Sequence, residues 1–255
     1  MQEETELPKD LLSKAGLSEG VKKERWTGMN IVYNEDCFPA MQKYPDKYFD
    51  LAVVDPPYFS GPERRRYYGA KVSATKVERK YYPVLDHWER PSIDYFAELV
   101  RISKTYIVWG CNYFDVVFPS GRIVWDKCNG SSTYSDCEIA ATNAHDSVRL
   151  FRYMWNGMMQ GKSIEEGHIA RGNKSENEFR IHPTQKPLDL YRWVYMKYAK
   201  EGFKILDTHV GSGTSRRAAY DFGLDFIGYE IDENMFRLQE EAFNDYTSQL
   251  RINFV

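Results

Sequence analysis

The sequence predicts an α/β fold, a doubly wound and mostly parallel sheet of seven strands with helices on both faces. Three observations predict it. Short apolar runs alternate with amphipathic stretches, as expected when crossover helices join parallel strands. The apolar run at 49–54 stops on Asp-Pro-Pro-Tyr, and the run at 204–206 leads into a turn that contains two glycines. The carboxyl ends of the strands bind ligands in open α/β sheets, so both turns are candidate sites.

Length and composition set the expected domain organisation. The chain has 255 residues, of which 42% are apolar and 28% are charged, which suits one large α/β domain with small insertions. Residues 1–27 are polar without an apolar stripe, so we expect an N-terminal tail there. Residues 28–255 are expected to form a single domain that carries a basic loop at 60–88 and a small insertion at 143–181.

The secondary-structure elements follow from the apolar pattern. The expected strands are the apolar runs at 29–33, 49–54, 105–109, 122–125, 138–142, 204–206 and 225–229. The expected helices are the stretches at 38–43, 93–101, 187–200, 215–222 and 233–250. The helix at 187–200 begins with a proline, carries Leu190, Val194 and Tyr198 at four-residue spacing, and is followed by Gly202. Residues 143–181 have weak periodicity and scattered glycines, so loops and short helices are expected there.

Cysteine and histidine usage gives no sign of a metal site. The four cysteines form no Cys-x-x-Cys pair, and no histidine pair has zinc-ligand spacing. They are typical of reduced thiols in a cytoplasmic protein. No signal peptide and no apolar stretch of about 20 residues is visible, so no membrane span is expected.

Charge is distributed unevenly along the chain. The net charge of −3 excludes a molecule that is basic overall. Residues 63–80 nevertheless hold seven lysines and arginines against two glutamates, a local charge of 7 − 2 = +5. This stretch is either a solvated loop or an arm that contacts phosphates, and its place directly after residues 55–58 favours the arm.

The Asp-Pro-Pro-Tyr corner at 55–58 is the first chemical signal. Two prolines remove two backbone donors and fix two φ angles, so neither a helix nor a central strand can continue through them. The result is a rigid corner that presents Asp55 and Tyr58 just past the carboxyl end of a buried strand.

The stretch 204–232 is the second signal, predicted as strand, tight turn, helix, strand and terminal acid. Gly211 and Gly213 let the backbone turn sharply and approach a ligand. The turn is not a P-loop, since no Gly-Lys-Ser/Thr follows, and the third glycine of a dinucleotide fingerprint is missing. Asp207 precedes it, and Glu230, at the end of the next strand, can accept hydrogen bonds from ribose hydroxyls. A nucleoside cofactor without a pyrophosphate is indicated, with an ordinary turn as the alternative.

A stiff turn at 182–187, His-Pro-Thr-Gln-Lys-Pro, leads into the helix at 187–200. It is either an ordinary helix boundary or a cofactor contact, and spacing alone does not decide between them.

Together these three motifs resemble those of amino-group DNA methyltransferases. Their order, with the Asp-Pro-Pro-Tyr motif first and the glycine turn last, resembles the β-class, and especially the short adenine-N6 enzymes of phages and prophages. The segments 107–114, 123–127 and 149–158 strengthen the likeness, which covers about residues 28–240. The resemblance implies a circularly permuted Rossmann-like fold, S-adenosylmethionine as cofactor and DNA as substrate.

The resemblance assigns roles residue by residue. The strand at 29–33 is expected beside the last strand, which would place Asp36 near the adenine ring of the cofactor. Thr184 and Lys186 lie in the motif that is near the methionine moiety. The chain departs from the β-class where Thr208 and His209 replace Pro-Phe, and His209 could stack on the cofactor as Phe does. The full expected cofactor set is Asp36, Thr184, Lys186, Asp207, Thr208, His209, Gly211, Gly213, Thr214 and Glu230.

The expected catalytic residues are Asp55, Pro56, Pro57 and Tyr58. An exocyclic amine is a poor nucleophile because its lone pair is spread into the ring. Asp55 and the carbonyl of Pro56 can each accept one N–H, which localises that lone pair, while Tyr58 stacks on the base. The base must be flipped out of the duplex to reach them. An internal salt bridge that occupied Asp55 would exclude this mechanism.

The expected DNA contacts lie in the basic loop and are Arg64, Arg65, Arg66, Tyr67 and Lys71. The insertion at 143–181 is too short for a large recognition domain, so a short or relaxed recognition sequence is expected. The alternatives are N4-cytosine methylation, which shares the same chemistry, and a non-catalytic subunit that binds S-adenosylmethionine. The β-class resemblance is compatible with a homodimer and with a role in restriction–modification.

Overall fold

The computed structural model describes residues 5–6, 22–23, 28–58, 89–129, 135–156, 159–161, 178–182 and 184–252. The basic loop at 60–88, with the expected DNA contacts Arg64, Arg65, Arg66, Tyr67 and Lys71, lies outside the described residues, as does most of the tail at 1–27. No helix among the described residues is long and apolar enough to cross a membrane.

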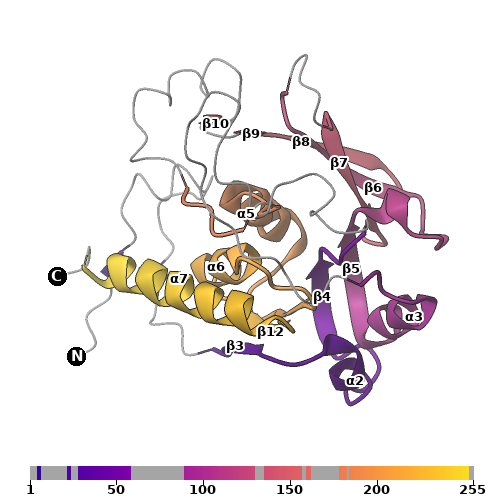
Figure 1. Cartoon of the computed structure of the whole chain (residues 1–255), viewed down its shortest axis with the longest axis horizontal. Coiled ribbons are helices and arrows are strands. Elements are labelled where there is room, and N and C mark those ends of the chain that lie inside the picture. The colour runs from indigo at the N-terminus through magenta and orange to yellow at the C-terminus, as the bar shows by residue number, and fades with distance from the viewer. Residues whose placement is uncertain are drawn as a thin grey trace.

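A single large sheet organises the described chain (Figure 1). Its strands, in spatial order, are β3 (Asn30–Tyr33), β12 (Asp225–Tyr229), β11 (Lys204–Asp207), β4 (Phe49–Val54), β5 (Ser103–Trp109), β7 (Cys137–Thr142), β6 (Gly121–Asp126) and β8 (Val148–Arg152). β7 pairs antiparallel with both its neighbours, and the other pairs in this sheet are parallel. The expected fold class is confirmed.

Within the described residues the sheet has eight strands rather than the expected seven, because β8 comes from a stretch in which loops and short helices were expected. This strand pairs with β6 at the edge of the sheet, and its Val148 and Leu150 are exposed. An edge strand with little burial lacks the apolar pattern on which strand prediction depends. The same stretch also forms an antiparallel pair, β9 (Met154–Asn156) with β10 (Met159–Gly161). A further short pair joins β1 (Thr5–Glu6) to β2 (Lys22–Lys23).

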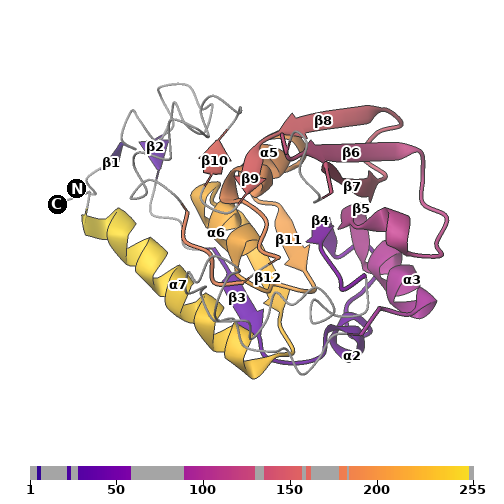
Figure 2. The same ribbon diagram turned by 45° about the horizontal axis from the view of Figure 1, so that its top comes forward.

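Two cores form because consecutive strand residues point to opposite faces. On β4, Leu51 and Val53 pack into one core and Ala52 and Val54 into the other. The helices divide in the same way (Figures 1 and 2). One face is covered by α5 (Leu188–Tyr198), α6 (Thr214–Asp221) and α7 (Glu233–Ile252), and the other by α2 (Cys37–Met41) and α3 (Ile93–Ile102). All five expected helices are present, and each begins and ends within two residues of its expected position.

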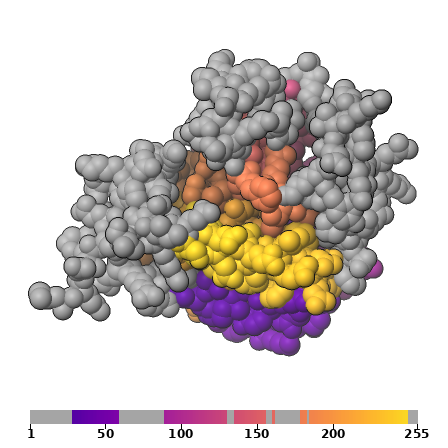
Figure 3. All heavy atoms as spheres, turned by 60° about the vertical axis from the view of Figure 1, so that its left-hand side comes forward, coloured from indigo at the N-terminus to yellow at the C-terminus, as the bar shows by residue number. Residues whose placement is uncertain are grey.

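The two halves of the chain meet between β3 and β12, as the circular order requires. Ile31 lies opposite Ile227 in the parallel register. The Asn34 side-chain amide also donates to the carbonyl of Glu230 at 2.7 Å. Figure 3 shows α7, in yellow, on the surface beside the indigo segment that contains β3. The ends of β3 and β12 therefore lie together.

The position of β4 creates the site. From β4 the chain crosses through α3 to β5 on one side, whereas β11 lies on the other side. The strand order reverses at this point, and a crevice opens outside the carboxyl ends of β4 and β11. Asp55 follows β4 directly and Asp207 is the last residue of β11.

Candidate functional site

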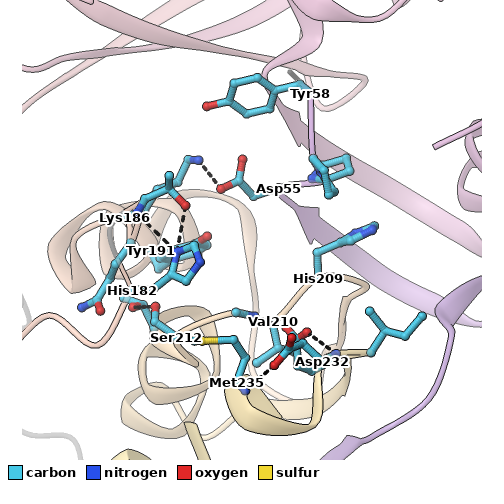
Figure 4. Close-up of a pocket in the computed structure, with 18 residues that line it drawn as sticks. Asp55, Tyr58, His182, Lys186, Tyr191, His209, Val210, Ser212, Asp232 and Met235 are labelled. Atoms are coloured by element: carbon cyan, nitrogen blue, oxygen red, sulfur yellow. Dashed lines mark hydrogen bonds and ion pairs between the residues drawn. The ribbon is translucent and has the colours of Figure 1, made fainter. Parts of the chain in front are cut away.

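A cleft opens at this reversal point (Figure 4). The empty space in it, together with the open solvent at its mouth, amounts to about 850 Å³. Ten of the expected site residues line it, namely Asp55, Pro56, Pro57, Tyr58, Thr184, Lys186, His209, Gly211, Thr214 and Glu230. The structure therefore brings together three motifs that are far apart in sequence.

The Asp55 carboxylate has two unlike oxygens. Oδ2 forms an ion pair with the ammonium group of Lys186. Oδ1 is buried and has no hydrogen-bond partner among the described residues. Figure 4 shows this oxygen on the side of the carboxylate that faces Tyr58. Burial raises the pKa of Asp55 above its ordinary value, against the lowering effect of Lys186.

The ion pair corrects the expectation that Asp55 is free of internal salt bridges. Lys186 pairs with Oδ2 only, so the carboxylate is half engaged: one oxygen has a partner, and Oδ1 has none among the described residues. A carboxylate has about four lone-pair positions, and Oδ1 keeps its capacity to accept an N–H. An unpartnered buried acceptor costs about 1–3 kcal/mol, which a donor from a bound ligand would offset. This ion pair is the kind of contact that was expected to exclude the mechanism. The mechanism is retained as a proposal because it uses only Oδ1, which Lys186 does not occupy.

Tyr58, which lines the cleft, is held in a stack with a second tyrosine. Its ring lies parallel to that of Tyr113, with centroids 4.6 Å apart and planes 7° apart. Gly110, in the left-handed region at φ 68°, lies against the same ring. A Cβ on Gly110 would be 2.5 Å from Cδ1 of Tyr58, so only glycine allows the ring this position.

The glycine turn after β11 is tied to the end of β12. Gly211, at φ 52°, donates its N–H to Oε2 of Glu230 at 2.8 Å, and Oε1 of Glu230 accepts the N–H of Asp232 at 2.9 Å. Burial raises the pKa of Glu230. The turn and the acid thus form one wall of the cleft.

Asp207 supports this turn from beneath and does not line the cleft. Its carboxylate accepts the N–H of His209 at 3.1 Å and the hydroxyl of Ser215. Burial raises the pKa of Asp207 to about 7. Gly213, at φ 70°, caps α6 behind the cleft, so neither residue touches the open space directly.

His209 faces the cleft, while Thr208 anchors it. The Thr208 hydroxyl is 2.9 Å from Nδ1 of His209 and 2.6 Å from the hydroxyl of Tyr95. Burial lowers the pKa of His209 to about 4, so its ring is neutral at pH 7. A neutral aromatic ring therefore lines the cleft at this position.

The His-Pro-Thr-Gln-Lys-Pro turn proves to be both helix boundary and cleft wall. Pro187 immediately precedes α5, and the Leu188 N–H is accepted by Glu178 at 2.9 Å. The Gln185 carbonyl accepts the Trp155 indole N–H at 2.7 Å, which pins the turn to β9. His182 Nδ1 lies 2.8 Å from the Thr184 hydroxyl.

Asp36 lies at the end of β3, as expected, but outside the cleft lining. It is exposed and caps α2 by accepting the Phe38 N–H at 2.9 Å. Its role toward a cofactor remains a prediction. Eight lining residues were not expected, namely His182, Gln185, Tyr191, Val210, Ser212, Ile231, Asp232 and Met235. Most adjoin a predicted motif, so a wider window around each motif would have found them.

Comparison with known proteins identifies the family. Residues 49–241 match the family of N6 and N4 methyltransferases, described as DNA methylase. The match spans most of the chain, which therefore belongs to this family. Its members act on exocyclic amino groups of DNA bases, so the protein is an amino-group DNA methyltransferase.

Individual relatives are distant. The type II methyltransferase M.HinfI of Haemophilus influenzae is 24% identical over 256 residues, covering 85% of this chain and 69% of the relative. M2.LlaDCHI of Lactococcus lactis subsp. cremoris is 23% identical over 244 residues, covering 84% and 89%. The crystal structure of the M1.HpyAVI–SAM complex is 20% identical with a TM-score of 0.47, covering 83% of this chain and 98% of that one.

Proposed function

We propose that the protein transfers a methyl group from S-adenosylmethionine to N6 of an adenine that is flipped out of DNA. The observation that carries the proposal is the Asp55 carboxylate at the reversal point, whose Oδ1 points toward Tyr58 and has no hydrogen-bond partner among the described residues. An exocyclic NH₂ has the two donors that this corner requires. Asp, rather than Ser, before Pro-Pro-Tyr favours adenine over cytosine in the resemblance.

The cleft has features that suit a nucleoside cofactor. Glu230 has lone pairs beyond those used by Gly211 and Asp232, which ribose hydroxyls can use. The neutral His209 ring provides an apolar surface. Bound S-adenosylmethionine supplies an electrophilic methyl group on a sulfonium. Glu230, Gly211, His209 and Thr184, which all line the cleft, would hold it.

The protein's own residues would activate the amine. Asp55 Oδ1 accepts one N–H and the Pro56 carbonyl accepts the other, which directs the nitrogen lone pair away from the base plane. The rigid prolines keep both acceptors in place, so positioning and electrostatics provide the catalysis. Formation of the N–C bond would break the bond between the methyl carbon and the sulfonium sulfur, which would leave as a neutral thioether. The methylated nitrogen would carry the positive charge until its proton passes to Asp55 Oδ1 and then to water. Tyr58 holds the base by stacking.

The DNA contacts and the specificity are proposed from the sequence. The arginines at 64–66, Tyr67 and Lys71 would contact the DNA backbone beside the flipped base. β8 and the β9–β10 pair use part of the insertion at 143–181, which leaves still fewer residues to read a sequence. We therefore expect a short or relaxed site. A homodimer remains a prediction.

The test is methyl transfer by the protein alone. Duplex DNA is incubated with protein and labelled S-adenosylmethionine, digested to nucleosides and analysed by mass spectrometry. We expect N6-methyladenine, whereas N4-methylcytosine would replace the proposal by its nearest rival. No transfer at all would favour a non-catalytic subunit. Sequencing of the modified positions would reveal the recognition site, and a strict six-base site would contradict relaxed specificity.

The matched variant is Asp55→Ala, with Asp50→Ala as control. Asp55→Ala should abolish transfer while the cofactor dissociation constant stays within about threefold. Asp50 is the second residue of β4, pairs with Lys104 at 2.7 Å and does not line the cleft. Substantial activity in purified Asp55→Ala would refute the proposed role.

A further inference from the structure

Asp55 is the first member of a row of four alternating charges. Lys186 Nζ contacts Asp55 Oδ2 and also lies 3.1 Å from Glu138 Oε2. Glu138 Oε1 in turn lies 2.6 Å from Lys127 Nζ. The side chains of Lys186, Glu138 and Lys127 are only 2%, 19% and 18% exposed. Glu138 and Lys127 were not among the expected site residues.

The antiparallel direction of β7 brings Glu138 to the site. β4, β5 and β6 end at the edge where Asp55 lies, and β7 runs the other way, so it begins there. Glu138 is the second residue of β7, opposite Trp125 on β6, and Lys127 follows the end of β6. Had β7 been parallel, Glu138 would lie at the far edge of the sheet.

Each lysine of the row lies over an indole ring. Lys186 Nζ is 5.7 Å from the ring centroid of Trp109, and Lys127 Nζ is 5.0 Å from that of Trp125. Burying charges costs several kcal/mol per ion, and well-packed apolar residues of similar size are often as stable or more so. If these side chains only held the turn before α5 in place, apolar residues could do so without buried ions. Charged neighbours are required if the row controls a reacting carboxylate.

We propose that Glu138 and Lys127 are positioning residues that set the orientation and proton affinity of Asp55 through Lys186. The proposal rests on the proposed function of Asp55 as the acceptor of the amino group. Glu138 shares the Lys186 ammonium with Asp55, so that Lys186 stays on Oδ2 and leaves Oδ1 for substrate. Without Glu138, the whole Lys186 charge would face Asp55 and weaken it as an acceptor.

The electrostatics of the row agree with this geometry. Burial acts against the charges of both Glu138 and Lys186. The two lysines nevertheless lower the pKa of Glu138 to about 2, and the two carboxylates raise the pKa of Lys186. Glu138 therefore remains anionic and Lys186 cationic across the working range of pH.

Other titratable groups near Asp55 do not replace this control. They are Tyr95, Tyr191 and Asp207. Burial raises the pKa values of Tyr95 and Tyr191 well above the ordinary value, so both remain neutral. Burial raises the pKa of Asp207 to about 7, but Asp207 is unchanged in every variant below. Its effect on the pKa of Asp55 is therefore the same in each comparison.

The test measures the pKa of Asp55 directly in the whole protein. Carboxyl carbons of ¹³C-labelled aspartate are titrated by NMR, and the Asp55 signal is the one missing from Asp55→Asn. Glu138→Gln removes a nearby negative charge and should lower this pKa by about 1 unit. Lys127→Gln removes a positive charge and should raise it. Glu138→Asp should stay near wild type, as should Glu240→Gln, whose partner Arg216 lies outside the cleft lining.

Opposite shifts from Glu138→Gln and Lys127→Gln support the proposal, because mere loosening of the fold would not produce opposite signs. Shifts that are absent, or equal in sign, overturn it. If Glu138→Gln fails to fold, the remaining titrations decide the proposal. It then requires that Lys127→Gln raise the pKa of Asp55 and that Glu138→Asp leave it near the wild-type value.

Single-turnover methylation separates this inference from the proposed function. Glu138→Gln should slow the methyl-transfer step about tenfold while the dissociation constants for DNA and cofactor stay within twofold. Should Asp55→Ala remain active, the proposed function fails, whatever the titrations show. Should the titrations show no shift while Asp55 is essential, only the role of Glu138 and Lys127 fails.

Discussion

The contact between Gly110 and Tyr58 allows a sharp test of base stacking. A Cβ at Gly110 would lie 2.5, 2.8 and 3.0 Å from Cδ1, Cε1 and Cγ of Tyr58. Ordinary contacts exceed about 3.4 Å, so Gly110→Ala must displace the ring by roughly 1 Å. Tyr113 stacks on this ring, so the displacement also disturbs that stack. The ring would then lose its alignment with a flipped base.

The magnitude follows from two separate terms. Alanine at φ 68° costs roughly 1–2 kcal/mol of stability, because the left-handed conformation crowds Cβ. Base–aromatic stacking is worth about 1–3 kcal/mol, which corresponds to a loss of about 5- to 150-fold in kcat/KM. Gly110→Ala should therefore show both a modest drop in stability and a large drop in methylation.

Gly202→Ala is a matched control. Gly202 has φ 76°, close to that of Gly110, but a Cβ there would meet nothing within 4 Å. It should show a similar loss of stability and nearly unchanged methylation. The measurements are urea unfolding and kcat/KM for DNA. Equal methylation by Gly110→Ala and Gly202→Ala would refute the reasoning about the Tyr58 ring.

Three further predictions concern the cofactor wall and the basic loop. Burial lowers the pKa of His209 to about 4, so the folded protein loses stability as pH falls below about 6.5. As pH falls from 7 to 5, the free energy of unfolding of the wild type should therefore drop by about 2 kcal/mol more than that of His209→Phe, measured by urea unfolding. Methylation by His209→Phe should stay within about tenfold of wild type. The same pH dependence in both proteins would show that the ring is not buried as a neutral group. Glu230→Gln should weaken cofactor binding about 10- to 100-fold, measured by calorimetry, because hydrogen bonds to a charged group are lost. The control Glu98→Gln, on α3, should bind the cofactor as the wild type does. Equal binding by both variants would show that Glu230 does not contact the cofactor. Neutralising the arginines at 64–66 should reduce the slope of log affinity for DNA against log salt by up to about 2.7, and an unaltered slope would speak against phosphate contacts.

Sequence reasoning succeeded where the signal is local. β4 and β12 begin and end at the expected residues, because both are mostly apolar and β4 stops at the Asp-Pro-Pro-Tyr corner. The Asp-Pro-Pro-Tyr corner could be placed for the same reason. β8 was missed because it is an exposed edge strand, and the cleft residues of the segment after Glu230 were missed because nothing in their own sequence distinguishes them.

By itself, the sequence determined the fold class, the order of the motifs and which side chains stand at strand ends, since prolines, glycines and apolar runs act over a few residues. Which charges meet depends instead on how distant parts of the chain pack together. Lys186 reaches Asp55 across 131 residues of chain, and Glu138 joins them because one strand runs against its neighbours. Strand direction and side-chain pairing depend on the packing of the whole sheet, so no local pattern could have revealed that the central carboxylate is half engaged.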